Sequence, residues 1–417
     1  MDWIDILTII SRVLTVLLTV CYFYQFLYLF VPLVWKKRPH KPAVQNRYAV
    51  LIAARNEEAV LPHLLDSLTA QDYPPELVQV FVVADNCTDR TAEVARAKGA
   101  TVFSRSNQAQ VGKGYAIAYL LEQIEAQTGL EHFDAFLLFD ADNVLEPDYI
   151  TQINRVCSDG YPVFAGYRNT KNFGTNWLTA GHGLMFLHEA CHLNQSRMLL
   201  GTGCMVGGTG FGFTRQVLQQ CGGWRFFTLT EDLEFSAWCA SNGVRIGYCH
   251  DAVFYDEQPE KFSVSWRQRT RWVQGGVQVG FRMGIHLLRG LRKPGWIRMA
   301  CLENLTLTLW GYALGTFNGG LTVLCAFLTS GWQGLLIALL LSLAGMLAAF
   351  FAIGGLTLWT EWHRIRATKT QKLLALFAFP VYMLSFLPIA ATALFRKYRW
   401  PPIVHTAAIS MEALEKK

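Results

Sequence analysis

The sequence is short of charge for its length. Asp, Glu, Lys and Arg make up only 16% of its 417 residues, where roughly a quarter is usual. Its mean hydropathy is positive, at +0.22. This shortage argues against a wholly soluble protein and points to contact with lipid.

The basic residues that remain are clustered rather than spread. The net charge of +6 is modest, and the clusters lie beside apolar stretches, which suits anionic headgroups and cytoplasmic loops better than nucleic acid. We therefore expect membrane lipids and no nucleic acid among the partners. The clusters are Lys36, Lys37, Arg38 and Lys41; Arg364, Arg366, Lys369 and Lys372; and Arg396, Lys397 and Arg399.

Two common motifs are missing. The ten cysteines include no CxxC pair, which argues against a zinc or disulfide framework and indicates reduced packing residues. A Walker P-loop is absent as well, because Asn107 stands where the first glycine would precede Gly112, and no Ser or Thr follows Lys113.

The N-terminus lacks the features of a signal peptide. It is acidic (Asp2, Asp5), and no small-residue cleavage site follows the apolar run. Residues 6–34 are apolar apart from Arg12, which is long enough for a membrane crossing of about 20 residues. We expect residues 1–40 to form a transmembrane helix, with the N-terminus outside and the following segment in the cytoplasm.

Residues 41–265 have the pattern of an α/β domain. Short β-rich runs at 48–53, 78–84 and 135–139 alternate with helical patterns at 57–68, 90–97 and 114–125, as in a mainly parallel sheet built from βαβ units. Ligands bind at the carboxyl ends of the strands in such sheets. Polar clusters follow the three runs: Arg55-Asn56-Glu57, Asp85-Asn86 and Asp140-Ala141-Asp142.

The remaining third of the chain is expected to be interfacial and transmembrane. Residues 266–300 form an amphipathic, Arg-rich stretch that would lie in the interface plane. In the transmembrane region 301–417, three apolar segments lie near 301–328, 335–359 and 373–395. Pro380 and Pro388 interrupt the third, so it can be a broken or re-entrant helix. The side on which the C-terminus lies stays open.

The DxD motif places two carboxylates together after a buried strand. Asp140 and Asp142 can hold a hard cation whose other ligands are diphosphate oxygens and water, although acidic residues after a strand are often turn formers. Asp85 can accept a nucleobase N–H, or its turn can serve as a helix cap. Lys113 can supply a cation to the donor, or be a solvated loop lysine.

Two further motifs follow. Asp232 in Thr230-Glu231-Asp232 can act as a general base, or face a helix macrodipole. In Gln268-Arg269-Thr270-Arg271-Trp272, Arg271 can pair with diphosphate oxygens, and Trp272 can stack on a sugar or anchor an interfacial helix.

A zinc-protease pattern competes with these motifs. His188-Glu189-Ala190-Cys191-His192 fits HExxH, in which two histidines one helical turn apart bind zinc and the glutamate activates water. A third ligand would be needed, and none is evident from spacing. This leaves a membrane metallopeptidase as an alternative of another class.

The four motifs, in this order, resemble glycosyltransferase family 2, in particular the membrane branch with cellulose, chitin and hyaluronan synthases. The resemblance implies a nucleotide-sugar-binding domain of GT-A type inserted between transmembrane helices, with Mg²⁺ or Mn²⁺ as cofactor. Asn86 is a departure, since many relatives have an acidic residue or glycine there. The implied sites are Arg55, Glu57, Asp85, Lys113, Asp140, Gln268 and Arg271 for the nucleotide sugar, Asp140 and Asp142 for the metal, Asp232 and Glu231 for catalysis, and Gly208, Thr209, Gly210 and Trp272 for the acceptor.

The function implied is inverting transfer of a sugar from a UDP-sugar to an acceptor hydroxyl. The leading hypothesis is processive synthesis and translocation of a β-linked polysaccharide, and the alternative is single-sugar transfer to a lipid or polyprenol. In either case we expect a multi-pass protein of a bacterial plasma membrane whose catalytic domain is cytoplasmic.

Overall fold

The computed structural model describes residues 2–36, 39–395 and 407–415. Within these residues a single mixed sheet of eight strands forms in the order β3-β2-β1-β4-β7-β6-β8-β5. The neighbours β3, β2, β1 and β4 are parallel, β7 is antiparallel to both β4 and β6, and β6 and β8 are parallel. The strands are β1 (Tyr48–Ala54), β2 (Val78–Asp85), β3 (Thr101–Arg105), β4 (Ala135–Asp140), β5 (Val144–Leu145), β6 (Val163–Thr170), β7 (Phe211–Thr214) and β8 (Ile246–Asp256).

Helices cover both faces of the sheet. The strands β1 and β4 are apolar along nearly their whole length because both of their faces are buried. One face packs against α5, α7 and α10, and the other packs against α3 and α6. The helices of the domain are α3 (Leu61–Thr69), η1 (Pro75–Leu77), α4 (Thr91–Ala97), α5 (Lys113–Gln127), η2 (Leu130–His132), α6 (Tyr149–Ser158), α7 (Trp177–His188), η3 (Glu189–Asn194), α8 (Gln195–Leu200), α9 (Arg215–Cys221) and α10 (Glu231–Asn242).

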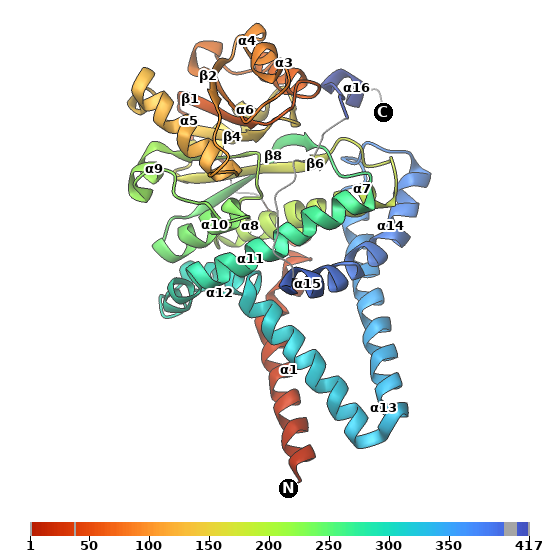
Figure 1. Ribbon diagram of the computed structural model, residues 1–417. Coiled ribbons are helices and arrows are strands. Elements are labelled where there is room, and N and C mark those ends of the chain that lie inside the picture. The colour runs from red at the N-terminus through yellow and green to blue at the C-terminus, as the bar shows by residue number, and fades with distance from the viewer. Residues whose placement is uncertain (1, 37–38, 396–406, 416–417) are drawn as a thin grey trace.

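Long helices lie below the sheet domain in Figure 1. α11 is a single helix along the underside of the domain, and it packs against α10, α12 and α15. Helix α1 and both arms of α13 project away from it. These elements are α1 (Trp3–Tyr28), α2 (Val31–Val34), α11 (Phe262–Gly290), α12 (Trp296–Thr306), α13 (Leu309–Thr360), α14 (Lys369–Leu384), α15 (Phe386–Phe395) and α16 (Met411–Glu415).

Helix α13 is a hairpin of two apolar arms. Ser330 and Gly331 have non-helical backbone angles, with φ of 59° at Gly331, and the chain reverses there (Figure 1). The first arm pairs with α1, because the hydroxyls of Ser11 and Thr322 lie 2.9 Å apart. Three helical stretches, Trp3–Val34, Ala313–Thr360 and Lys369–Ala393, are long and apolar enough to cross a membrane by length and composition. These helices indicate membrane association.

The third of these stretches does not continue as one straight helix. α14 ends at Leu384, and α15 runs on in a different direction beneath α11. α14 packs closely on α7, because a Cβ on Gly181 would lie 2.4 Å from the ring of Tyr382. The sequence analysis predicted a broken helix here from its two prolines, and the break falls between them, at Ser385.

The two chain ends lie at opposite ends of the molecule. The N-terminus is at the tip of the apolar helices, whereas residues 407–415 lie beside the sheet domain (Figure 1). The backbone N–H of Ala407 donates to Glu257 Oε2 at 3.0 Å, and Lys171 Nζ donates to the Ala407 carbonyl at 3.3 Å. The basic residues Lys37, Arg38, Arg396, Lys397 and Arg399 lie outside the described residues.

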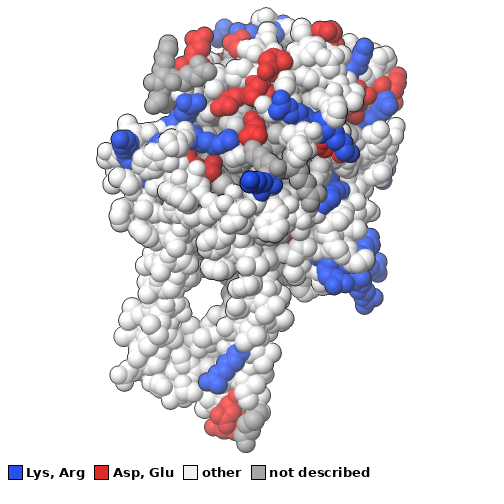
Figure 2. Space-filling model, turned by 180° about the vertical axis from the view of Figure 1, so that it is seen from behind, with Lys and Arg blue, Asp and Glu red and all other residues white. Residues whose placement is uncertain are grey.

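Charged side chains are common on the sheet domain and rare on the projecting helices. In Figure 2 the Lys, Arg, Asp and Glu side chains gather on the sheet domain and at its lower border, while the projecting helices are almost free of them except near the N-terminal tip. The exposed surface of those helices is apolar, with Val20, Leu341 and Trp332 each more than two thirds exposed. Such a surface is suited to lipid rather than water.

Candidate active site

One pocket lies at the carboxyl ends of β1, β2 and β4, where the polar clusters were predicted. Its volume is about 400 Å³, which suits a small-molecule ligand. Helices α7, α10 and α11 form its other wall, on the side of the apolar arms. Of the predicted site residues it is lined by Arg55, Glu57, Asp85, Lys113, Asp140, Asp142, Gly208, Glu231, Asp232, Gln268, Arg271 and Trp272.

Asp85 is held by a buried ion pair. Arg105 on β3 is its register partner across the parallel pair, and Arg105 Nη1 donates to Asp85 Oδ1 at 2.6 Å. Both side chains are less than a tenth exposed. The guanidinium therefore fixes one carboxylate oxygen, while the side chain still lines the pocket.

Two asparagines shape the turns beside Asp85 and Arg55. Asn56 and Asn86 have positive φ, 58° and 54°, a region that Asn tolerates better than most residues. Asn56 Oδ1 accepts from the Thr88 N–H at 2.7 Å, which ties the two turns together. Asn86, the departure from the family pattern, has a structural use, because its Oδ1 accepts from the Asn107 N–H at 2.9 Å.

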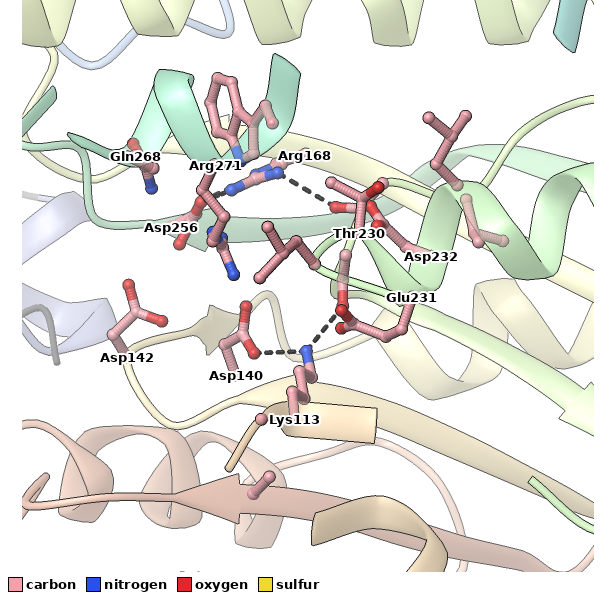
Figure 3. A pocket seen from close by; sticks show the side chains of 18 of the residues that line it. Lys113, Asp140, Asp142, Arg168, Thr230, Glu231, Asp232, Asp256, Gln268 and Arg271 are labelled. Carbon is pink, nitrogen blue, oxygen red and sulfur yellow. Dashed lines mark hydrogen bonds and ion pairs between the residues drawn. The ribbon is translucent and has the colours of Figure 1, made fainter. Parts of the chain in front are cut away.

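Asp140 ends β4 and is paired with Lys113 at the start of α5. Lys113 Nζ donates to Asp140 Oδ1 and also to the Gly208 carbonyl at 2.7 Å (Figure 3). The Asp140 N–H donates to the hydroxyl of Thr209 at 2.8 Å. Thr209 is buried and does not line the pocket, so it supports the DxD turn from behind.

Gly210 also lies behind the pocket wall, because a Cβ there would come within 2.0 Å of the Phe254 ring. The acceptor roles predicted for Thr209 and Gly210 are therefore not supported by their positions. Gly208, the remaining member of the predicted group, does line the pocket.

The DxD turn fits a hard divalent cation. Both aspartates line the pocket, and carboxylate oxygens are the ligands that Mg²⁺ and Mn²⁺ prefer. The Glu257 N–H donates to Asp142 Oδ2 at 3.1 Å and orients that carboxylate. Since no group of three or more metal-binding side chains occurs in the described part of the chain, a cation here would take its other ligands from the diphosphate and water.

The sequence analysis missed an ion pair in this pocket. Arg168 on β6 donates through Nε to Asp256 Oδ2 at 2.7 Å, at the end of the neighbouring β8. Its Nη1 donates to the Gly207 carbonyl at 3.1 Å, and its guanidinium lies 3.7 Å from the centre of the Phe186 ring. Burial raises the pKa of Asp256 to about 6, which Arg168 opposes and nearby Asp142 reinforces. Arg168 and Asp256 lie on two parallel strands, β6 and β8, and no short sequence motif contains both residues.

Glu231 and Asp232 begin α10 and face the pocket (Figure 3). Burial and, to a smaller extent, the charge of Asp232 raise the pKa of Glu231 to about 7 against the opposing charges of Lys113 and Arg271. Burial also raises the pKa of Asp232, while backbone N–H groups at the start of the helix and Arg271 oppose the shift. A carboxylate with a raised pKa takes up a proton more readily, as a general base must.

Helix α11 supplies the predicted QxxRW residues to the pocket. Gln268, Arg271 and Trp272 all line it. The ring of Trp272 is half-buried and packs edge-on against Phe186, with the ring centres 5.9 Å apart. Trp272 thus lies in the pocket wall rather than on the lipid-facing surface that the interfacial-anchor alternative requires.

The HExxH residues do not assemble a zinc site. His192 uses both ring nitrogens, since Nδ1 lies 3.0 Å from the Leu29 carbonyl and Nε2 lies 3.3 Å from the Thr360 hydroxyl. Burial lowers the pKa of His188 to about 3, so it stays neutral in the core. Glu189, the second residue of the HExxH pattern, lines the pocket.

Comparison with known proteins agrees with this geometry. Residues 45–275, more than half of the chain, match the model of the family described as glycosyltransferase like family 2. The chain belongs to this family. The glycosyltransferase prediction is therefore confirmed, and the metallopeptidase alternative is wrong.

Curated relatives of two kinds are similar to the chain. A β-monoglucosyldiacylglycerol synthase of Synechocystis is 27% identical over 63% of this chain and 57% of its own length. A poly-β-1,6-N-acetyl-D-glucosamine synthase of Staphylococcus aureus is 25% identical over 64% of this chain and 63% of its own length. The chain thus spans less than two thirds of these relatives, one a lipid glycosyltransferase and the other a polysaccharide synthase.

A solved structure confirms the GT-A fold. The mannosyltransferase PcManGT of Pyrobaculum calidifontis, determined with GDP-mannose and Mn²⁺, has a TM-score of 0.57, with 18% sequence identity over 93% of this chain and 98% of that one. The likeness covers the long helices as well as the sheet domain. The predicted fold, a mostly parallel sheet between long apolar helices, is therefore confirmed.

Proposed function

We propose that this enzyme transfers a single sugar from a UDP-sugar, with inversion, to a hydroxyl of a membrane lipid acceptor. The observation that supports this is the character of the pocket at its membrane-facing end. Besides its polar residues, the pocket is lined by the apolar side chains of Met185, Phe186, Met205, Leu233 and Leu307. A polar nucleotide sugar gains little from contact with these apolar side chains, whereas a lipid acceptor can bury its own apolar surface against them.

Leu307 connects this end of the pocket to the apolar helices. It lies in the short link between α12 and α13, where the first arm of the hairpin leaves the domain. The two arms of α13 are apart near the domain and join at the lower turn (Figure 1), and Figure 2 shows an opening between the helices. An acceptor lipid can approach through this opening with its headgroup directed at the pocket.

The pocket residues provide the chemistry of an inverting transfer. Asp232 takes the proton of the acceptor hydroxyl, the hydroxyl oxygen attacks C1 of the sugar, and the bond from C1 to the diphosphate oxygen breaks with its electrons on the diphosphate. Lys113 and Arg271 place positive charge near the departing group. A Mg²⁺ or Mn²⁺ ion held by Asp140 and Asp142 would supply Lewis-acid stabilisation of the diphosphate when bound.

We assign the role of base to Asp232 alone, and a single base opposite the diphosphate is why we infer inversion. Attack from the side of Asp232, opposite the diphosphate, replaces the leaving group in one displacement. The nucleobase of the donor would lie beside Asp85, and Arg55 and Glu57 would border the nucleotide.

We place the sheet domain in the cytoplasm of a bacterial cell. If α1 and the two arms of α13 each cross the plasma membrane, three crossings put the N-terminus outside and the domain inside. Residues 407–415, which lie beside the domain, are then on the same side of the membrane as the domain. The packing of α14 on α7 and the course of α15 beneath α11 are consistent with a third apolar segment that stays at the interface.

Processive polymer synthesis, the leading hypothesis from the sequence, is less well supported by this arrangement. Translocation needs a closed path through the membrane, and in the described residues the second arm of α13 is exposed along most of 332–352. Because the relative from Staphylococcus aureus is a polysaccharide synthase, a polymer product is the competing outcome in the test of this proposal.

The test is an acceptor assay on purified protein in detergent. UDP-glucose, UDP-galactose and UDP-N-acetylglucosamine are each supplied with Mn²⁺ and a bacterial lipid extract, and products are separated by solvent partition and weighed by mass spectrometry. We expect one sugar to be added to a lipid. A ladder of sugar polymers that forms equally without lipid would overturn the proposal.

A variant in the apolar end sharpens this assay. Leu307→Gln is expected to slow transfer to a long-chain acceptor more than transfer to a short-chain analogue with the same headgroup. Leu291→Gln, in the loop after α11, is the matched control. Equal slowing for both chain lengths would show that Leu307 does not contact the lipid chain.

A further inference from the structure

Glu189, the glutamate of the HExxH pattern, lies in the pocket without a partner. It begins η3, a π-helical turn between α7 and α8. Such turns are rare and are frequent at functional sites. Its carboxylate lines the pocket and receives no hydrogen bond or ion pair from any described residue.

Six other carboxylates of the pocket differ in this respect. Asp85, Asp140 and Asp256 each form an ion pair, and Asp142 accepts a backbone N–H. Glu231 and Asp232 accept backbone N–H groups at the start of α10. Glu189 is partly exposed and lines the pocket, so its carboxylate is open to a ligand that supplies a hydrogen-bond donor.

Glu189 and the proposed base Asp232 lie beside consecutive glycines. A Cβ on Gly207 would lie 3.6 Å from Glu189 Oε1, and a Cβ on Gly208 would lie 3.5 Å from Asp232 Oδ2. These glycines are consecutive, so their Cα atoms are about 3.8 Å apart. Burial raises the pKa of Glu189, the charges of Arg168 and Arg197 oppose this shift, and the charge of Asp232 adds to it.

We propose that Glu189 binds a second hydroxyl of the acceptor, adjacent to the hydroxyl that Asp232 deprotonates. This inference rests on the proposed function and names the acceptor more closely. The acceptor headgroup has hydroxyls on neighbouring carbons, as the sugar of a glycolipid or a glycerol headgroup does. A lipid with a single hydroxyl, such as diacylglycerol, leaves Glu189 unpaired.

The apolar surroundings reinforce the selection. Met185 and Phe186, one turn before Glu189 on α7, line the same end of the pocket, and Arg168 is held over the Phe186 ring by its pairing with Asp256. The guanidinium of Arg168 is thereby committed to Asp256, the Gly207 carbonyl and this ring, and in this proposal Glu189 and Asp232 orient the headgroup.

The experiment compares matched acceptors in wild type and Glu189 variants. Monoglucosyldiacylglycerol and 1,2-diacylglycerol are presented in the same mixed micelles, and octyl glucoside and 1-octanol form a second pair without a lipid backbone. We expect wild type to favour the polyhydroxy member of each pair about ten- to a hundredfold in kcat/KM, the effect of one hydrogen bond to a charged group.

Glu189→Ala should raise the KM for the polyhydroxy acceptor by a similar factor and remove the preference within each pair. Glu189→Gln should restore part of it, since the amide oxygen still accepts a hydrogen bond. Dissociation constants for UDP should stay within about twofold in both, and Glu93→Gln, on the exposed face of α4, controls for loss of a carboxylate elsewhere.

Either of two results would overturn the inference: a wild-type preference for the single-hydroxyl acceptors, or an unchanged acceptor KM in Glu189→Ala. Failure of the proposed function looks different. There the wild type glycosylates neither lipid, and the comparison of octyl glucoside with 1-octanol still decides the role of Glu189.

Discussion

The donor end and the acceptor end of the pocket treat their carboxylates in opposite ways. At the donor end, Asp85 and Asp140 are each neutralised by a cation from an adjacent element. At the acceptor end, Glu189, Glu231 and Asp232 form no ion pair within the described residues, and burial raises the pKa of each. Paired charges fix a site that receives an anionic donor, while carboxylates with a raised pKa take up a proton more readily and can exchange a proton or a hydrogen bond with a neutral acceptor.

The supporting elements differ in the same way. The donor end is built from turns at the ends of parallel strands, held by contacts such as Asn56 with Thr88. The acceptor end is built from α7, α10 and α11, which also contact the apolar helices. Substitutions at the two ends should therefore separate donor binding from transfer.

The largest effect is expected from Asp232→Asn. The amide keeps the size of the side chain but cannot take the proton of the acceptor hydroxyl, so the transfer rate should fall roughly a hundred- to ten-thousandfold. UDP affinity, measured by calorimetry, should be close to that of wild type. If UDP affinity fell as far as the rate, Asp232 would belong to the donor end.

Asp142→Asn should act at the other end. Loss of one hard ligand weakens cation binding, and turnover should fall about a hundredfold or more at limiting Mn²⁺. Excess Mn²⁺ should recover part of the activity, which it cannot do for Asp232→Asn. Normal turnover at limiting metal would refute the metal assignment.

The contrast between the two ends also separates what the sequence could and could not predict. Asp85 and Asp140 follow apolar strands directly, so the strand pattern alone places them at one edge of the sheet. Arg168 and Asp256 had no such signal, since they lie in strands 88 residues apart that become neighbours only through the order of the sheet. The sequence singled out Glu189 only as part of the HExxH pattern, and the structure shows that it lines the pocket.

The apolar helices show a second limit of sequence patterns. Hydropathy measures whether a segment can leave water and does not say whether lipid or protein replaces it. Phe379 and Tyr382 in α14 are fully buried against protein, while Leu341 in α13 is exposed, although all three lie in segments apolar enough to cross a membrane. The small residues Gly181 and Gly354 allow α14 to pack, which hydropathy does not register.

A smaller effect is expected from Trp272→Ala. An aromatic face in contact with a sugar contributes about 0.5–1.5 kcal/mol beyond burial, so the acceptor KM should rise about three- to tenfold. The affinity for UDP and the extraction of the protein from membranes by detergent should be the same as for wild type. Trp359→Ala, whose side chain is 68% exposed near the end of α13, is the matched control for a membrane anchor. If the two variants behave alike, the assignment of Trp272 to the acceptor end is wrong.

The smallest effect concerns stability and follows from the raised pKa at the acceptor end. Burial raises the pKa of Glu231 from 4.5 to about 7, so the folded protein binds this proton more tightly than the unfolded chain. The stabilisation from that proton is complete below about pH 4.5 and is lost as pH rises through about 7. At pH 8 the folded protein therefore holds a buried charge that the unfolded chain carries at no cost.

Glu231→Gln replaces that charge with a neutral group of the same shape. Without donor or metal, the variant should be more stable than wild type at pH 8 by about 1–3 kcal/mol, a rise of a few degrees in Tm. The gain should disappear by pH 5, where wild type is protonated. Asp85→Asn, which breaks the donor-end pair with Arg105, should instead lower Tm at pH 8, because it leaves a buried guanidinium without its partner. Thermal unfolding of both variants between pH 5 and 8 measures this contrast, and a pH-independent gain in Glu231→Gln would show that its carboxyl is not protonated near neutrality.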